Sequence, residues 1–353
     1  MKNGLLIWWS NNSRAESVLA RIAMDSGLPL GIVISETRYP PAPQILKYAH
    51  IYYRVFSETS LTEIESFASK FATDSESDRI VLAPTSEYIL DLISEFRSAI
   101  FEVPISSDLP YRNLSSKSFM AEYFSHNRII KTPLDGPSVL LQKEFVAKPK
   151  FNVMDGKVLK PFKVDGAKSL DLFNGLISSY FPQEYISPPS FYWCAYRSKT
   201  GKICSYFQRN LLQEDHGGSI VSAELGSPPN DIQLKFSLEN FLERINFLGP
   251  MMIELRGSEQ KFIELNPRFW GPLLLSLNLP SNPVRAFFED MFDTQPNLTA
   301  FQRLDGTYIV PILMHGDNQI VNVADDIQTY HSRGSFENTI SAGMDFSQLG
   351  GHW

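Results

Sequence analysis

The side chains best suited to chemistry lie between positions 251 and 272, in the stretch MMIELRGSEQKFIELNPRFWGP. Apolar and polar residues alternate on both sides of a polar turn, which predicts an antiparallel hairpin with one aliphatic and one polar face. In the register that the turn favours, Glu254 lies opposite Glu264, and Asn266 follows on the same face. Facing carboxylates repel each other unless a cation lies between them. Because carboxylate and amide oxygens suit magnesium, these residues are candidate metal ligands; a solvated strand face is the alternative.

The end of the hairpin presents a cation to this face. Pro267 cannot donate to a strand ladder, so the strand is expected to stop there. Arg268 then lies beside the candidate metal ligands. Since a guanidinium matches phosphate and carboxylate groups well, Arg268 is a candidate catalytic residue.

The run IELNPRFWG resembles the metal-binding strand of the ATP-grasp ligases. That family carries Glu-x-Asn-x-Arg, preceded by an acidic residue on a neighbouring strand. Glu264, Asn266 and Arg268 match this pattern in order, and Glu254 supplies the preceding acid. The resemblance implies two cofactors, ATP and Mg²⁺, with Mn²⁺ as an option.

Two lysines fit the phosphate side of such a site. Lys117 lies in the first turn of a predicted helix. The amino end of a helix already carries partial positive charge, so a lysine there is favourable when both bind the same anion. The family has a lysine at this point that contacts ATP phosphates. Lys148 ends the strand-like run EFVAKPK and resembles the family's lysine that reaches the α- and β-phosphates. An exposed, solvated lysine is the alternative at either position.

The segment FPQEYI resembles the family's hinge between two subdomains, where main-chain groups read the adenine edge and an acid contacts the ribose or the amino group. The resemblance assigns these positions to Gln183, Glu184, Tyr185 and Ile186. An edge strand that enters a loop is the alternative. Arg209, which follows a predicted hairpin, is a second candidate catalytic residue that would hold the transferred phosphate or the substrate carboxylate.

Two loops bear on the phosphate chemistry. The Gly-Gly-Ser turn at 217–219 allows backbone amides to converge on an anion, and His216 beside it is either a base or incidental. The segment 151–164 departs from the family, which carries a glycine-rich loop there. It has one glycine, Gly156, and three lysines, which would replace amides or form a solvated face.

The composition is that of an ordinary globular protein, with 43% hydrophobic and 20% charged residues among 353. A net charge of −7 disfavours nucleic acid and anionic membranes as partners. The apolar run near the amino terminus lacks the features of a secretory signal, and no apolar run approaches the roughly 18 residues that span a bilayer. Cys194 and Cys204 are expected to be free. We expect a cytoplasmic protein, with a homodimer as one option.

The elements that must position the candidate residues begin with an open parallel sheet. Apolar runs at 4–10, 30–34 and 79–83, separated by helical patterns, predict this sheet and its right-handed crossovers. No Gly-x-Gly-x-x-Gly follows the first run, so a dinucleotide is not expected. Polar residues near the carboxyl ends of these runs bind a ligand or serve as helix caps and turns: Ser10, Asn11, Thr85, Ser86 and Glu87.

The predicted fold class is mixed α/β and α+β. An amino-terminal open parallel α/β domain over 1–112 precedes a two-lobed ATP-grasp domain over 113–297. A lid lobe is predicted over about 141–210, in the sense of a segment that excludes water. Residues 298–353 are predicted to pack on the ATP-grasp domain.

The resemblance implies an ADP-forming carboxylate–amine ligase. A substrate carboxylate would attack the γ-phosphate to give an acyl phosphate, and an amine would then displace phosphate to form an amide. Lys117, Lys148 and Arg268 would stabilise charge rather than act as nucleophiles. The expected partners are a small-molecule carboxylate and an amine. Two alternatives stay open: an enzyme that modifies a sugar acid or another metabolite, and an ATP-binding module without turnover.

Overall fold

The structure is a computed structural model of the chain. The residues that it describes are 2–9, 12–35, 41, 43–55, 60–93, 98–151, 153–154, 157–213, 220–277 and 279–298. Some positions singled out in the sequence lie outside this set: Ser10, Asn11, Gly156, His216, the turn at 217–219 and the segment 299–353.

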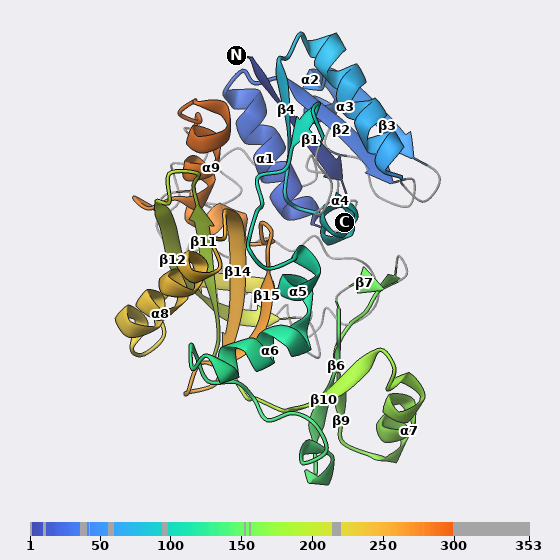
Figure 1. The fold of residues 1–353 in the computed structure, drawn as a ribbon, viewed down its shortest axis with the longest axis vertical. Coiled ribbons are helices and arrows are strands. Elements are labelled where there is room, and N and C mark those ends of the chain that lie inside the picture. The colour runs from blue at the N-terminus through green and yellow to red at the C-terminus, as the bar shows by residue number, and fades with distance from the viewer. Residues whose placement is uncertain are drawn as a thin grey trace, which may run out of the picture.

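The amino-terminal region forms a five-stranded parallel sheet in the order β3-β2-β1-β4-β5, as predicted for an open α/β layer (Figure 1). Its strands are β1 (Asn3–Trp9), β2 (Leu30–Ser35), β3 (Ile51–Val55), β4 (Arg79–Leu82) and β5 (Phe101–Glu102). The edge strands β3 and β5 escaped the sequence analysis because neither is a continuous apolar run. The crossovers leave β1 and β4 in opposite directions, so these neighbours form the switch point at which open α/β sheets bind ligands.

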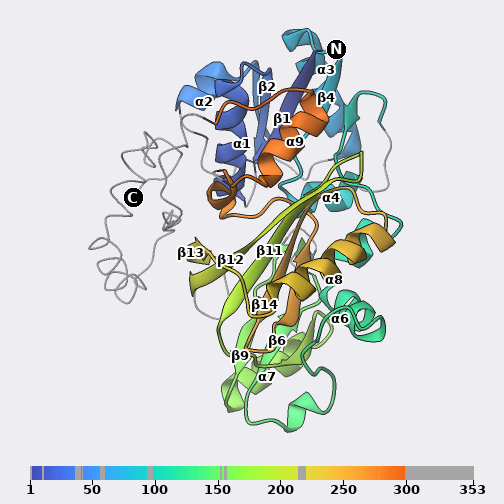
Figure 2. The ribbon, with the colours of Figure 1, turned by 90° about the vertical axis from the view of Figure 1, so that its left-hand side faces the viewer.

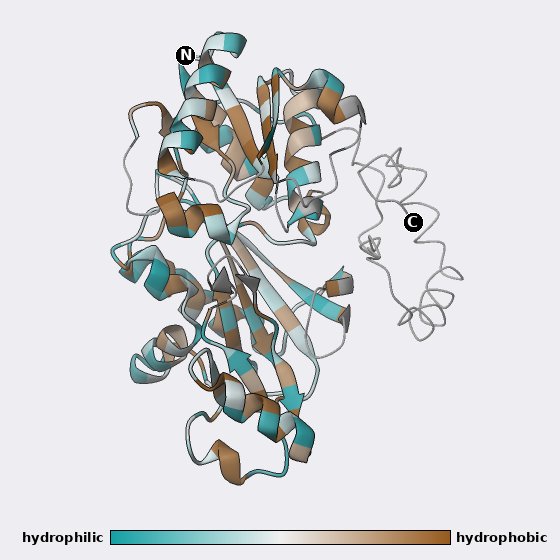
Figure 3. Cartoon of the chain, turned by 90° about the vertical axis from the view of Figure 1, so that its right-hand side faces the viewer, coloured by the Kyte–Doolittle hydropathy of each residue, from teal (hydrophilic) through white to brown (hydrophobic). Residues whose placement is uncertain are grey.

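Helices cover both faces of this sheet, which explains why its central strands are apolar throughout. The helix α1 (Ser13–Asp25) packs in one cluster with Leu5 and Ile7. The helix α3 (Leu61–Ser75) packs in another with Leu6 and Trp8, the strand residues that alternate with the first pair. Figure 3 shows brown strands in the amino-terminal sheet between helices that carry teal turns. The region also contains α2 (Pro43–Tyr48) and α4 (Glu87–Ile93).

A second five-stranded sheet is antiparallel, in the order β13-β12-β11-β14-β15, and is called the larger sheet below. Its strands are β11 (Ser190–Arg197), β12 (Ile203–Gln213), β13 (Ile220–Leu225), β14 (Gly249–Arg256) and β15 (Lys261–Asn266). On one face its apolar residues pack with α5 (Tyr111–Ser115), α6 (Lys117–His126) and α8 (Asp231–Arg244). On the other face, α9 (Pro283–Phe292) packs together with α1 (Figure 2).

A smaller antiparallel sheet has the order β10-β6-β9 and is covered by α7 (Ala167–Leu176). It consists of β6 (Phe145–Pro149), β9 (Phe162–Val164) and β10 (Tyr180–Glu184), and a separate two-stranded ribbon joins β7 (Val153–Met154) to β8 (Lys157–Val158). The predicted lid range of about 141–210 is too long in one respect: β11 and β12 are hydrogen-bonded into the larger sheet. The strand pairing therefore divides that range after β10, while the domain boundaries stay predictions.

Two smaller expectations concern cysteines and membranes. Cys194 and Cys204 are both free and buried, as expected. Within the described residues, no helix is both long and apolar enough to cross a membrane.

Candidate active site

The β14–β15 hairpin forms in the predicted register, and Glu254 pairs with Glu264 across the two strands. Gly257 begins the turn with a φ of 77°, a conformation that favours glycine. A Cβ there would lie only 2.9 Å from the Cγ2 of Ile186. Because cross-strand partners point to the same side, both carboxylates lie on one face of the larger sheet, the face that we call the site face.

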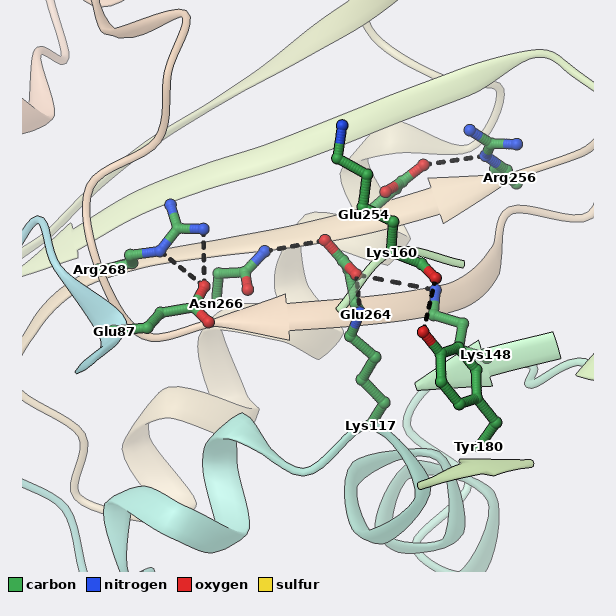
Figure 4. Close-up of polar contacts among 10 residues, drawn as sticks. All are labelled: Glu87, Lys117, Lys148, Lys160, Tyr180, Glu254, Arg256, Glu264, Asn266 and Arg268. Carbon is green, nitrogen blue, oxygen red and sulfur yellow. Dashed lines mark hydrogen bonds and ion pairs between the residues drawn. The ribbon is translucent and has the colours of Figure 1, made fainter. Parts of the chain in front are cut away.

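The two predicted lysines converge on Glu264 from different elements (Figure 4). Lys117, in the first turn of α6, places its Nζ 2.9 Å from Glu264 Oε2. Lys148, on β6 of the smaller sheet, places its Nζ 3.7 Å from the same oxygen. Asn266 donates from Nδ2 to Glu264 Oε1 at 3.0 Å. Both lysines are at most 4% exposed, so neither is a solvated surface residue.

Burial and charge oppose each other at this cluster. Burial by itself would raise the pKa of Glu264, but Lys117 and Lys148 hold it below the usual value. Burial lowers the pKa of Lys148 to about 8, with Glu264 acting to raise it and Lys117 to lower it. Two buried ammonium groups thus share one carboxylate. Such an excess of buried positive charge favours a polyanionic ligand.

Glu254 has a different cation. Its Oε1 accepts from Arg256 Nε at 2.9 Å and from Ser190 Oγ at 3.3 Å. Repulsion between the two facing glutamates is therefore offset by Arg256 on one side and by the lysines on the other. In this arrangement the carboxylates are neutralised by side chains of the chain itself.

The candidate metal ligands Glu254, Glu264 and Asn266 stay on adjacent strands and supply only oxygen donors to a cation. No group of three His, Cys, Asp or Glu among the described residues could hold a metal ion. Two carboxylates and one amide fit Mg²⁺, which takes its remaining ligands from water and phosphate oxygens and does not need a full protein cage. The donor set thus fits the predicted metal only in the presence of a phosphate-bearing ligand.

Arg268 follows β15 but pairs with a residue of the amino-terminal region. Its Nε and Nη2 lie 2.7 and 2.6 Å from Glu87 Oε1, and its Nη1 donates to the Phe269 carbonyl at 2.9 Å. Glu87 is the first residue of α4, directly beyond β4. The predicted active-site arginine and one of the predicted strand-end residues are thus brought together as a pair.

Arg209 is not brought to the site face, which corrects the sequence-based assignment. Its cross-strand partner Phe191 and the next residue in that row, Leu255, belong to the apolar cluster under α6 and α8. The Arg209 side chain is about half exposed and pairs with Glu224 at 3.6 Å. Neighbouring residues of a strand point to opposite faces, so Gln208 is the residue that reaches the site face.

A chain of buried hydrogen bonds on the site face was not predicted from the sequence. Gln208 Nε2 donates to Asn210 Oδ1 at 2.7 Å, and Asn210 Nδ2 donates to Ser190 Oγ at 2.9 Å. Ser190 in turn donates to Glu254. Gln208 is fully buried, yet its Oε1 has no hydrogen-bond partner in the described part of the chain. The alternation of side chains along 190–197 and 203–213 shows which of these residues share a face. It does not show that they lie beside Glu254 unless the pairing of β11 with β14 is known.

The predicted hinge residue Glu184 ends β10 and is held on two sides. Its carboxylate accepts from the backbone N–H of Leu134 at 2.9 Å and from Lys261 Nζ at 2.9 and 3.1 Å. Its own N–H donates to the Leu134 carbonyl at 2.8 Å. The link from Lys261 on β15 to Glu184 on β10 ties the larger sheet to the smaller one.

The other three hinge positions differ in their surroundings. Gln183 is buried and forms an isolated bridge with Asp135. The Tyr185 ring has the Nζ of Lys163 4.9 Å from its centroid. Ile186 packs against the turn of the β14–β15 hairpin. The segment thus connects the two sheets, and its contact with a nucleotide stays a prediction.

Two polar residues that follow β4, Ser86 and Thr85, differ in their contacts. Ser86 accepts from the Ile89 N–H at 3.4 Å, as a helix cap does. Thr85 is 1% exposed, and no described group bonds its hydroxyl. The adjoining backbone is held across the interface, since Asn12 Nδ2 donates to the Phe269 carbonyl at 2.9 Å.

Solved structures share this architecture at low sequence identity. N5-carboxyaminoimidazole synthetase from Staphylococcus aureus complexed with ADP is 14% identical, with a TM-score of 0.59 over 82% of this chain and 76% of that one. The biotin carboxylase domain of a Hydrogenobacter thermophilus 2-oxoglutarate carboxylase, in complex with MgADP and bicarbonate, is 11% identical, with a TM-score of 0.61 over 82% and 70%. N5-carboxyaminoimidazole ribonucleotide synthetase from Thermus thermophilus is 14% identical, with a TM-score of 0.57 over 83% and 79%.

No protein-family model matches the chain, and no curated protein sequence matches it. The structural likeness shows the fold alone, and this fold is the one that the resemblance to ATP-grasp enzymes predicts.

Proposed function

We propose that this protein is an ATP-dependent ligase that activates a small carboxylate as an acyl phosphate and joins it to an amine, releasing ADP and phosphate. The observation that carries the proposal is the convergence of two buried lysines, from α6 and β6, on one carboxylate of β15. These elements come from three separate parts of the chain. Their side chains form a buried cluster with one ammonium group more than Glu264 can balance.

ATP with Mg²⁺ is the ligand that best satisfies this cluster. Lys117 and Lys148 would bind phosphate oxygens, as ammonium groups at a helix amino terminus and a strand end can do. Glu254, Glu264 and Asn266 would hold the metal, which would supply positive charge to neutralise the phosphate groups. The neighbours complexed with ADP and MgADP support this choice of ligand.

The chemistry asked of the chain is positioning and electrostatic stabilisation. The carboxylate oxygen attacks the γ-phosphorus, and the bond to the β–γ bridging oxygen breaks, so that ADP leaves with the negative charge. Arg268 would hold the reacting carboxylate or the transferred phosphoryl group. The amine then displaces phosphate from the acyl carbon and loses a proton, which forms the amide.

Water must be excluded while the acyl phosphate exists, because water competes with the amine. We assign this role to the smaller sheet, which carries Lys148 on β6 and faces Glu264. The Glu184–Lys261 pair at the hinge then joins that lid to the larger sheet.

A substrate screen tests the proposal. The full chain is incubated with MgATP, hydroxylamine and one member of a panel of amino acids, hydroxy acids and sugar acids. A true ligase releases phosphate with one of these carboxylates and forms the matching hydroxamate, since hydroxylamine replaces the amine. Release with a sugar acid alone would favour the modifying enzyme over the amino-acid ligase. MgATP binding with no carboxylate-dependent release across the panel would contradict ligase activity and leave the ATP-binding module.

A further inference from the structure

Arg268 is held by the amino-terminal domain and not by the strand that precedes it. The guanidinium meets one carboxylate oxygen of Glu87 through Nε and Nη2, while Glu264 and Asn266 lie just before it on β15 (Figure 4). The two partners are separated by 181 positions. The contact therefore couples the end of β4 to the end of the candidate metal-binding strand.

The backbone around Arg268 is fixed from the same side. The N–H of Phe269 donates to the Pro84 carbonyl at 2.9 Å, and the Phe269 carbonyl accepts from Asn12 Nδ2. Pro84 follows β4 and Asn12 follows β1, so both lie at the switch point of the parallel sheet. The residues after β1 and β4 therefore hold both the backbone of Phe269 and the side chain of Arg268.

The donor count shows what this anchoring leaves available. A guanidinium has five N–H donors in a rigid fork. Glu87 takes Nε and one side of Nη2, and the Phe269 carbonyl takes one N–H of Nη1. Within the described residues, these contacts leave one N–H on each terminal nitrogen. One donor from each terminal nitrogen can bind the two oxygens of a carboxylate or phosphate in a bidentate manner.

The surroundings make the pair strong. The Arg268 and Glu87 side chains are 20% and 12% exposed. Burial raises the pKa of the nearby Tyr111 phenol, and Glu87 raises it further, while Arg268 opposes them. Charges so little exposed to water are weakly screened, so loss of one partner changes the orientation and energy of the other more than it would at the surface.

We propose that Glu87 is a positioning residue that sets the Arg268 fork for the anion in the active site. The inference rests on the proposed function, because it assigns Arg268 to the reacting carboxylate or phosphoryl group. It adds that the amino-terminal domain takes part in the chemistry by orienting a side chain of the ATP-grasp domain. A lysine at 268 cannot take this role, since an ammonium group has no fork to orient.

A second cross-domain ion pair supplies a matched control. Glu102 of β5 pairs with Lys199 of the β11–β12 hairpin at 2.9 Å and also with Arg79. It joins the same two regions, but its partners are more exposed than Arg268, and neither is a candidate site residue. Loss of Glu102 therefore reports the cost of breaking an interdomain pair without touching the site.

The test measures the binding of inorganic phosphate to the full chain saturated with MgADP, by calorimetry, which does not depend on knowing the carboxylate substrate. Glu87→Gln is expected to weaken phosphate binding about tenfold or more, the loss typical of hydrogen bonds to a charged group. The MgADP affinity of Glu87→Gln is expected to change less than about twofold. The phosphate affinity of the control Glu102→Gln is also expected to change less than about twofold. Glu87→Asp keeps the charge and is expected to recover part of the affinity, and it serves as the readout if Glu87→Gln does not fold.

A cycle with Arg268→Lys completes the experiment. If Glu87 acts through Arg268, Glu87→Gln adds no further loss of phosphate affinity in the Arg268→Lys background. Unchanged phosphate binding in Glu87→Gln, or an equal loss of MgADP affinity in Glu87→Gln and Glu102→Gln, would overturn the inference. Wild-type protein that binds MgADP without phosphate would overturn it too, whereas failure to bind MgADP at all would overturn the proposed function.

Discussion

Gln208 and Arg209 are neighbours in the chain, yet they belong to opposite faces of the larger sheet. On the site face, one cross-strand row runs through Gln208, Tyr192, Glu254 and Glu264. On the other face, the row through Arg209 continues into Phe191 and Leu255, beneath α6 and α8. The site face buries polar and charged groups beside the apolar side chains that pack with α1 and α9, whereas the other face buries an apolar cluster beneath α6 and α8.

The difference shows on which face of the larger sheet charged groups are buried. Charged groups removed from water must be paired or must meet a ligand. The site face meets this demand with Lys117, Lys148 and Arg256, which arrive from other elements or from the same hairpin. The face beneath α6 and α8 is lined by apolar side chains, and Arg209 stays half exposed at its margin.

The largest effect is expected when the site face loses the carboxylate of Glu264, which pairs with both lysines. Glu264→Gln is expected to reduce phosphate release by at least about a hundredfold, because the proposed metal would lose a carboxylate ligand and both lysines would lose their anionic partner. The fold is expected to stay intact. Phosphate release is measured with the best carboxylate from the screen, and the far-ultraviolet circular dichroism spectrum checks the fold. Unchanged turnover in this variant would refute the metal assignment.

The depressed pKa of Lys148 gives a pH-dependent test of the same face. In the folded protein Lys148 loses its proton as the pH rises through about 8 instead of 10.5, so MgADP affinity is expected to fall over that interval. The stability of the fold changes in the opposite direction. Between about pH 8 and 10.5 the unfolded chain keeps the Lys148 proton that the folded chain has lost, so the free energy of unfolding rises with pH over this interval.

The matched variant is Lys148→Met, which keeps the length of the side chain and removes the charge. We expect weaker MgADP binding at about pH 7 and loss of the decline above about pH 8. Calorimetric titrations at several pH values measure both. A decline of the same steepness in the variant would assign the pH effect to another group.

The buried Gln208 lies at the end of the cross-strand row that is farthest from Glu264. Gln208→Leu removes the donor to Asn210 and the acceptor that has no described partner. We expect a several-fold increase in the KM of the carboxylate, and a change in ATP binding of less than about twofold, because this end lies away from the lysines. An equal effect on both would show that Gln208 acts through the stability of the sheet.

The smallest effect is expected on the opposite face. Arg209→Ala removes only an exposed ion pair with Glu224, so turnover and the midpoint of thermal unfolding should change little. Steady-state kinetics and thermal denaturation check this beside Gln208→Leu. A tenfold loss of turnover in Arg209→Ala would break the distinction between the two faces.

The sequence by itself determined the β14–β15 hairpin and the pairing of Glu254 with Glu264, because alternation and a short turn fix the register locally. It also determined the open parallel sheet, whose buried central strands are continuous apolar runs. The position of Lys117 in a helical first turn and of Lys148 at a strand end indicated candidate phosphate-binding cations for the same local reason, whereas their burial came from the tertiary structure.

Only the tertiary structure decided which side chains share a face or an interface. The row that contains Gln208 depends on how β11 pairs with β12 and β14, and the contact between Arg268 and Glu87 joins residues 181 positions apart. The division of the predicted lid range after β10 and the Glu184–Lys261 link have the same origin. Local patterns specify the direction of a side chain relative to its own element, whereas the partner across the fold is set by packing that no local pattern encodes.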